Sequence, residues 1–184
     1  MQRIAALNPE TTTGKSKDLF NAVQSKLGMV PNMMRTFGNS PAALNGYLSF
    51  SAALSEGVLG GKLGELIALT VANVNQCDYC NAAHSFIGDK LVHIDANALA
   101  DARYGKSADV KIQAALNFSK VIVQKRGLVS DEDVNALKDA GYNDAEISEI
   151  IAHVGLNILT NYFNNAAKVT VDFPEVDLIE TAVI

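Results

Sequence analysis

The sequence predicts an all-α fold on three observations. Apolar residues recur three and four positions apart along most of the chain, which is the spacing of one helix face. Glycine and proline divide these segments into lengths typical of globular helices, as at Gly28, Pro41 and Gly60–Gly61. Alternating β-branched residues, which would indicate strands, are scarce before Val169–Pro174. We therefore expect a helical bundle with an extended C-terminal tail.

The expected helices are bounded by residues that favour helix ends. Gly28 and Pro31 end the first helix, and Ser40–Pro41 opens the second in the favoured order of cap followed by proline. The helix from Lys62 to about Val74 is apolar nearly all round, which is typical of a buried helix. A break at Asn75–Asp78 separates it from the next helix. In order, we expect helices at 16–27, from 41 to at least 54, 62–74, 78–91, about 94–103, about 107–126, 131–139 and 144–167.

One segment of the chain is repeated. Residues 65–83 are similar to residues 149–167: each begins with glutamate and an aliphatic run, and each ends in Asn-Ala-Ala. The second copy has Asn161 and Asn164 where the first has its two cysteines, and Lys168 where the first is followed by histidine. We interpret this as an internally duplicated helical pair, in which one copy does chemistry and the other packs against it.

Size and charge limit the classes of function. The 184 residues suffice for one domain at 1–184, with a helical core at about 16–168 and a tail at about 169–184. A domain of this length buries about 70% of its unfolded surface. The formal net charge is -5 and lysine and arginine form no run, so we expect no binding to nucleic acid.

Localisation is predicted from what the sequence does not contain. No apolar stretch reaches the roughly 18 residues of a membrane span, so we expect no membrane partner. Residues 1–9 have no signal-peptide core. We therefore expect a cytoplasmic protein in a reducing compartment, where two nearby cysteines are more often catalytic or metal-binding than a structural disulfide.

The two cysteines belong to the most informative cluster in the sequence. Cys77 and Cys80 are the only cysteines and stand three residues apart, and His84 follows Cys80 by four residues. On a helix these offsets place the side chains on one face. Two thiols this close can form a disulfide, and an adjacent base can generate the thiolate that attacks a peroxide. Glu65, on the preceding buried helix, needs a partner and can orient the His84 imidazole.

Residue chemistry leaves the order of the two cysteines open. Cys80 lies in the first turn of its helix, where the helix dipole favours an anion, and His84 can accept its proton. Cys77 is nearer the helix terminus and on position alone could be the more acidic thiol. Tyr79, between them, can donate a hydrogen bond or simply wall the pocket.

Several segments together carry a family resemblance: Glu65, the run Cys77–Cys80, His84, Leu27–Asn32, Asn161–Asn164 and Val171–Pro174. They resemble the alkylhydroperoxidase D (AhpD) and carboxymuconolactone decarboxylase superfamily, and in particular its peroxidase-related subgroup. The resemblance extends over about residues 18–174. It implies an all-helical, AhpD-like bundle that assembles as a homotrimer or a homohexamer.

The resemblance also implies a reaction and a catalytic set. Cys80 would attack a hydroperoxide and become a sulfenic acid, Cys77 would condense with it to a disulfide, and an external thiol or a lipoylated protein would reduce that disulfide. His84, Glu65 and Tyr79 complete the set, and no cofactor is implied. The family's peroxidase has histidine where this chain has Tyr79, so one member of the relay is changed.

Two other functions compete with this one. A zinc-binding protein without enzymatic activity could use Cys77, Cys80 and His84, but a closed zinc site needs four protein ligands and only His93 and His153 remain as histidines. We expect those two histidines to be structural or exposed. A cofactor-free decarboxylase or lactone-processing enzyme, as elsewhere in the superfamily, is the other alternative, although its decarboxylases generally lack the cysteine pair.

The tail predicts a contact between subunits. Residues 169–174 alternate apolar and polar, and residues 176–184 keep five aliphatic side chains, an apolar surface typical of partner sites. We expect the tail to lie on a neighbouring subunit of a homo-oligomer, with folding back on its own domain as the alternative. Met33–Met34 are expected in the core or an interface, and Tyr162–Phe163 in the repeat core or beside the active cleft.

Overall fold

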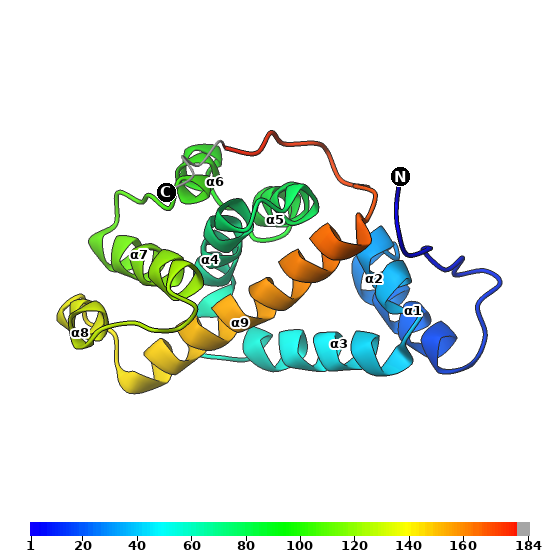
Figure 1. The fold of residues 1–184 in the computed structure, drawn as a ribbon, viewed down its shortest axis with the longest axis horizontal. Helices are drawn as coiled ribbons and strands as arrows, with labels where there is room; N and C mark the ends of the chain where they lie inside the picture. Colours follow the sequence, from blue (N-terminus) through cyan, green and yellow to red (C-terminus); the bar gives the residue numbers. More distant parts are fainter. Residues whose placement is uncertain (180–184) are drawn as a thin grey trace.

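The computed structural model describes residues 1–179, and this part of the chain forms nine helices and no strand (Figure 1). The all-α prediction is confirmed. The helices are α1 (Gly14–Leu27), α2 (Asn32–Phe37), α3 (Pro41–Ser55), α4 (Gly60–Val74), α5 (Asp78–Lys90), α6 (Ala96–Arg103), α7 (Val110–Gln124), α8 (Asp131–Asp139) and α9 (Asp144–Ala167). The bounds of α8 and α9 agree with the sequence prediction residue for residue, because Ser130 and Asn143 form complete capping boxes at their starts.

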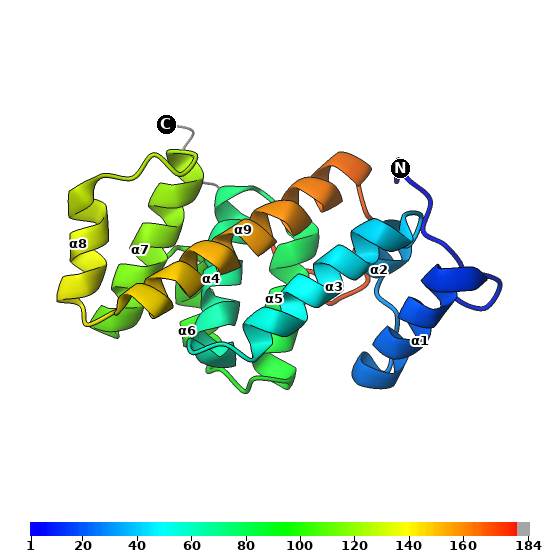
Figure 2. The ribbon, with the colours of Figure 1, turned by 90° about the horizontal axis from the view of Figure 1, so that it is seen from below.

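Helix α4 lies at the centre of the bundle, with α5, α6, α7 and α9 around it (Figure 1). Its leucine, isoleucine and valine side chains form the main core with residues of α7 and α9, as its apolar circumference predicted. A second core joins α1, α2 and α3 to the start of α5 and contains both cysteines. Figure 2 shows α3 beside α9, with α1 and α2 at one end of the molecule and α7 and α8 at the other.

Helix α2 is missing from the sequence prediction, which left the chain after Pro31 as a break. The helix begins at Asn32, directly after Pro31. Its first backbone N–H groups donate hydrogen bonds to residues that are far away in the sequence. The Asn32 N–H donates to Asp172 Oδ2 at 2.7 Å, across 140 residues, and the Met33 N–H donates to the Tyr79 hydroxyl at 3.1 Å. Because these partners are not local, no capping signal for α2 stands in its own sequence.

The two copies of the repeat do not each form a pair of helices, so the prediction of an internally duplicated helical pair is wrong. The first copy spans the end of α4, a break and the start of α5, whereas the second lies inside the single helix α9. The first copy turns at Gln76, whose φ is 51°, and the residue at that place in the second copy is Thr160. A β-branched residue rarely adopts positive φ, so the second copy continues as a helix. The copies do pack together, because α4 contacts α9.

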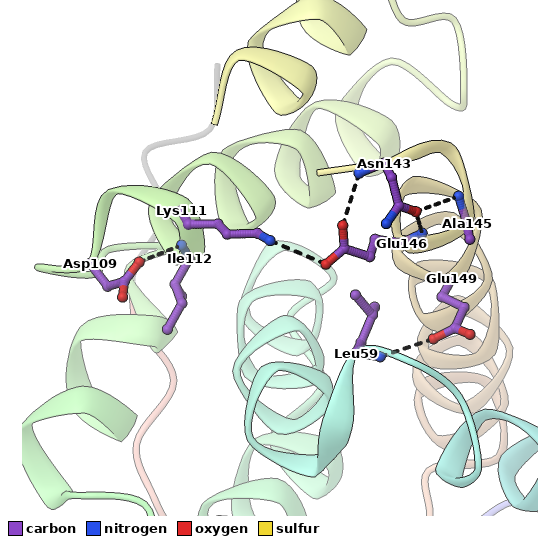
Figure 3. A network of polar contacts seen from close by, with 8 residues as sticks. All are labelled: Leu59, Asp109, Lys111, Ile112, Asn143, Ala145, Glu146 and Glu149. Atoms are coloured by element: carbon purple, nitrogen blue, oxygen red, sulfur yellow. Dashed lines mark hydrogen bonds and ion pairs between the residues drawn. The ribbon is translucent and has the colours of Figure 1, made fainter. Parts of the chain in front are cut away.

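The start of α9 is tied to α7 and to the start of α4 (Figure 3). Glu146 accepts from the Asn143 N–H at 2.8 Å and from Lys111 Nζ of α7 at 3.1 Å. Glu149, which occupies the place of Glu65 in the repeat, accepts from the Leu59 N–H at 3.1 Å and so caps the segment that enters α4. A carboxylate at a helix N-terminus is stabilised by unpaired amides and by the helix dipole.

The described part of the tail, residues 169–179, lies against its own domain. It crosses over α5 toward α6 (Figure 1), so these residues follow the alternative expectation, in which the tail folds back on its own domain. Asn81 Nδ2 of α5 donates to the Val176 carbonyl at 3.1 Å, and the Arg103 guanidinium donates to the Asp177 carbonyl. Side-chain donors thus satisfy these carbonyls of an extended segment that pairs with no strand within residues 1–179.

Residues 180–184 lie outside the described part of the chain. The expectation for the tail also drew on Val183 and Ile184, which fall within them. Among the helices of residues 1–179, none combines the length and apolar character that crossing a membrane requires.

Candidate active site

The two cysteines lie buried at the N-terminus of α5, and both are unoxidised thiols. Gln76 turns the chain at positive φ, and Cys77 then takes the extended conformation of an N-cap residue. The Cys77 Sγ accepts the Cys80 backbone N–H at 3.2 Å. The break between α4 and α5 therefore places both sulfurs at the positive end of a helix, as the residue spacing predicted.

His84 and Glu65 meet as predicted. His84 follows Cys80 by one turn of α5, and Glu65 lies on α4; His84 Nδ1 and Glu65 Oε2 are 2.8 Å apart. The two side chains are only 22% and 18% exposed, so solvent screens the pair weakly. With Nδ1 bound to the carboxylate, Nε2 is the ring nitrogen available to exchange a proton.

The pKa of His84 is raised above its ordinary value. Burial alone would lower it, because burial disfavours the imidazolium, but the Glu65 carboxylate and the Cys80 thiolate outweigh that effect. The imidazolium is therefore the favoured form of His84 when Cys80 is ionised.

The two thiols have pKa values shifted in opposite directions. Burial would raise the pKa of Cys80, but a hydrogen bond with Cys77, the charge on His84, and the amides of Asn164 and Asn161 together lower it to about 7. The same hydrogen bond with Cys80, together with burial, raises the pKa of Cys77. The geometry therefore favours Cys80 as the thiolate and Cys77 as its hydrogen-bond donor, a choice that helix position alone left open.

Two asparagines of α9, which the sequence analysis did not assign to the site, face Cys80. Asn164 Nδ2 donates to Cys80 Sγ at 3.2 Å and lies 3.3 Å from Met33 Sδ. Asn161 Oδ1 accepts from Asn75 Nδ2 at 3.0 Å. The repeat held the signal that could have found them, because these asparagines occupy the places of the two cysteines in the second copy.

Tyr79 walls the site, but its hydroxyl is directed to other partners. The hydroxyl accepts the Met33 N–H at 3.1 Å and donates to Asp172 Oδ1 at 2.8 Å. The ring meets Phe173 edge-on, with centroids 5.8 Å apart. Burial, which outweighs the opposing hydrogen bond from Met33, and the Asp172 carboxylate raise the pKa of Tyr79. Tyr79 thus fastens both α2 and the tail to the start of α5.

A mainly apolar cavity of about 260 Å³ reaches the reactive groups. Cys80 and His84 lie in its wall, and the rest is lined by side chains of α1 to α3 and the loop between α1 and α2, of α5 and α9, and of the tail. The apolar members of that wall are Leu27, Met29, Pro31, Met33, Met34, Ala83, Phe86, Ile87, Leu91 and Phe173. Met33 and Met34 therefore serve as core and cavity wall, one of the two alternatives expected for them.

A second, smaller cavity of about 150 Å³ lies on the Glu65 side of His84. It is lined in part by Glu65, His153 and Ser51, and it shares Tyr47, His84 and Thr160 with the apolar cavity. His84 therefore lies between the larger cavity, which reaches Cys80, and the smaller and less apolar cavity, which reaches Glu65.

The remaining sequence candidates lie away from the sulfurs. His93 is exposed in the loop before α6, with φ 58°. Tyr162 is 59% exposed, so it packs no core, while Phe163 stacks on Phe37 at a centroid distance of 3.6 Å. Within residues 1–179, no group of three or more His, Cys, Asp or Glu side chains is arranged to hold a metal ion.

Comparison with known proteins supports both the fold and the segment that carries the site. Residues 41–87, from the start of α3 to near the end of α5, match the carboxymuconolactone decarboxylase family. This segment contains Glu65, Cys77, Cys80 and His84. A comparison with curated proteins finds no significant match.

Solved structures share the fold over most of the chain. An uncharacterised peroxidase-related protein from Silicibacter sp. TM1040 is 24% identical, with 92% of this chain and 94% of that chain covered and a TM-score of 0.78. A peroxidase-related protein from Ralstonia eutropha JMP134, described as an alkylhydroperoxidase AhpD core, is 23% identical, with coverages of 93% and 92% and a TM-score of 0.83. The debrominase Bmp8 is 20% identical, with 86% of each chain covered and a TM-score of 0.72.

The resemblance inferred from the sequence is thereby confirmed at the level of fold and central segment: the chain has the AhpD-like fold of these peroxidase-related proteins, and its residues 41–87 match the carboxymuconolactone decarboxylase family.

Proposed function

We propose that the protein is a cysteine-dithiol peroxidase that reduces organic hydroperoxides. The observation that carries this proposal is the position of Cys80. Its sulfur lies in the wall of an apolar cavity, beside the His84–Glu65 pair, with a second thiol three residues away. These are the parts that a reactive thiol and its resolving partner require.

The first step is attack on the substrate. The Cys80 thiolate attacks the terminal oxygen of the hydroperoxide, so an S–O bond forms, the O–O bond breaks and Cys80 becomes the sulfenic acid Cys80–SOH. The alkoxide is the leaving group, and it departs as an alcohol after taking the proton held by His84. The Glu65 carboxylate keeps that imidazolium charged and oriented until the proton is transferred. The apolar wall of the cavity favours a substrate with a hydrocarbon or aromatic body.

The second step forms a disulfide. Cys77 Sγ attacks the sulfenic sulfur, and the hydroxyl leaves as water with the Cys77 proton. An external reductant, either a small thiol or a lipoylated protein, then supplies two electrons and two protons and restores both thiols. The turn at Gln76 places Cys77 outside the regular part of α5, so its side chain can approach Cys80 without unwinding the helix.

The cavity gives less support to a decarboxylase or lactone-processing function. Of the residues described along its wall, His84 alone can carry a positive charge, and no lysine or arginine is present to bind a substrate carboxylate. A dithiol reaction needs the Cys77–Cys80 pair, whereas a decarboxylase would keep its activity when both cysteines are replaced. Activity of the double serine variant toward a lactone or a β-keto acid would support that alternative.

We expect hydroperoxide to convert Cys77 and Cys80 into an intramolecular disulfide. Both cysteines fall in one tryptic peptide, 63–90, so the product is that peptide lighter by two hydrogens and resistant to alkylation until it is reduced. The measurement is stopped-flow oxidation of the reduced protein by several hydroperoxides, followed by mass spectrometry. A product that carries only sulfinic acid, with no crosslink, would contradict the dithiol mechanism.

We also propose that the protein is a homo-oligomer, and that the outer faces of α9 and α3 make the contact. Ile151, Leu159 and Tyr162 lie along one exposed stripe of α9 and are 48%, 44% and 59% exposed, and Phe50 of the neighbouring α3 is 39% exposed. An apolar face of this kind marks a partner site. Light scattering is expected to report a trimer or hexamer, as the family resemblance implies.

Charged substitutions on this face are expected to dissociate the oligomer. The pair Ile151→Glu and Leu159→Glu should lower the mass measured by light scattering to that of a smaller species. Leu128→Glu, at an exposed apolar residue of the loop before α8, is the control and should leave the mass unchanged. A monomeric parent protein at micromolar concentration would contradict the proposal.

A further inference from the structure

We infer that Asn164 and Asn161 form an amide cradle that stabilises the Cys80 thiolate, with Asn164 donating directly to the sulfur and Asn161 positioned beside it. The inference rests on the proposed function only in taking Cys80 as the attacking thiol. It adds two residues of α9 to a reactive centre otherwise built from α4 and α5.

The contact from Asn164 is the first observation. Its Nδ2 lies 3.2 Å from Cys80 Sγ and 3.3 Å from Met33 Sδ, and the side chain is 3% exposed. A thioether and a neutral thiol are weak acceptors, so this buried amide lacks a strong acceptor while Cys80 is protonated. Ionisation of Cys80 supplies one, because a hydrogen bond to a charged acceptor is stronger than one between neutral groups. The amide therefore favours the thiolate over the thiol.

The orientation of Asn161 is the second observation. Its Oδ1 accepts from Asn75 Nδ2 at 3.0 Å, which directs its Nδ2 away from Asn75. That Nδ2 is buried and has no hydrogen-bond partner among the described residues, and the side chain is fully buried. A buried donor without a partner is costly, and such a group in a folded protein calls for an explanation. The adjacent thiolate of Cys80 is an acceptor that would satisfy it, and the amide of Asn161 contributes to the lowered pKa of that thiol.

The position of the two asparagines opposite Cys80 follows from the repeat. Asn161 and Asn164 stand three residues apart on one face of α9, as Cys77 and Cys80 do at the start of α5, and they occupy the corresponding places of the second copy. Asn164 is the residue of the second copy that corresponds to Cys80. Because the two copies pack against each other, Asn164 contacts Cys80 itself. The second copy thus supplies neutral amides beside the Cys80 sulfur of the first.

The test measures the Cys80 pKa directly and needs no substrate. In a Cys77→Ser background, the thiolate absorbance and the rate of iodoacetamide alkylation are followed against pH. Asn164→Ala removes the donor, and Asn164→Asp keeps the shape but replaces the amide nitrogen with an acceptor. Both are expected to raise the Cys80 pKa by about one unit or more, which for a thiol with a pKa of about 7 corresponds to at least roughly fivefold slower alkylation at pH 7.

Asn157→Ala is the matched control. Asn157 is a buried asparagine of the same helix, but its Nδ2 donates to the His153 carbonyl at 2.9 Å and not to sulfur, so the Cys80 pKa should stay unchanged. Unfolding temperatures of all variants show whether each is folded. A Cys80 pKa that neither Asn164 substitution raises in a folded protein would overturn the inference.

A second measurement leaves both asparagines intact. In the Cys77→Ser protein, the side-chain NH₂ signals of Asn164 and Asn161 in nitrogen-15 NMR are expected to titrate with the same apparent pKa as the Cys80 thiol, and to be pH-independent in Cys80→Ser. Signals that do not follow Cys80 would overturn the inference even where the substitutions prevent folding. Because neither measurement uses a hydroperoxide, the cradle can be confirmed in a protein that fails as a peroxidase, and refuted in one that succeeds.

Discussion

Cys80→Ser is expected to abolish hydroperoxide consumption, by a factor on the order of 10³ or more, because it removes the nucleophile itself. Cys77→Ser should instead permit one turnover and then stop. The Cys80 thiolate can still be oxidised in that variant, but the sulfenic acid has no thiol to resolve it. The difference follows from the opposite pKa shifts of the two thiols, lowered for Cys80 and raised for Cys77.

Single-turnover kinetics and trapping separate the two variants. One equivalent of hydroperoxide should be consumed by Cys77→Ser and none by Cys80→Ser, and dimedone should label residue 80 in the former alone. Serine is the suitable replacement at position 77, because its hydroxyl can still accept the Cys80 N–H that Cys77 Sγ accepts at 3.2 Å. The reverse pattern, with trapping at residue 77, would exchange the roles of the two cysteines.

The parts of the structure that follow from the sequence are those with local causes. The bounds of α8 and α9 were predictable because Ser130 and Asn143 carry their own caps. The burial of α4 was predictable from its apolar circumference, and the partner of Glu65 from the need to pair a half-buried carboxylate. Spacing alone was enough to place Cys77 and Cys80 at the start of α5, with His84 one turn after Cys80.

The parts that the sequence did not reveal depend on contacts between distant segments. The first backbone N–H groups of helix α2 donate to Asp172 and Tyr79, and neither residue is near the helix in sequence. The tail was expected on a neighbour because its pattern is apolar, but side-chain donors such as Asn81 hold its backbone on its own domain. The repeat was visible, whereas the direction in which Asn164 points was not, since only the packing of α9 on α5 decides it.

The two cavities that share His84 suggest separate paths for substrate and protons in the proposed reaction. The substrate would enter the larger cavity that reaches Cys80, while protons would exchange through the smaller cavity, whose wall includes Glu65 and His153. His84 lies in the wall of both cavities, with Nδ1 committed to Glu65. An imidazole in this position can transfer a proton between the two spaces and keep water away from the sulfur.

His84→Ala is therefore expected to slow hydroperoxide reduction by roughly 10²-fold or more, the usual contribution of a positioned acid–base group. The pH profile of the parent protein should be bell-shaped. Its acidic limb reports ionisation of Cys80, which must lose its proton to attack, and its alkaline limb reports loss of the proton that His84 gives to the leaving alkoxide. Because the pKa of Cys80 is lowered and that of His84 is raised, activity should span the neutral range between the limbs.

Substitution of each residue of the pair is expected to change the profile differently. His84→Ala removes the positive charge that lowers the Cys80 pKa, so the acidic limb should move to higher pH and the alkaline limb should disappear. Glu65→Gln removes the carboxylate that raises the His84 pKa, so the alkaline limb should move to lower pH. The double variant should be little slower than His84→Ala, because Glu65 acts through the imidazole and the two effects are not additive.

His93→Asn, at an exposed histidine whose φ of 58° asparagine tolerates, is the control and should leave rate and profile unchanged. If His84→Ala and Glu65→Gln instead lowered the rate equally at every pH, with both limbs in place, the pair would support the structure of the site and take no part in proton transfer.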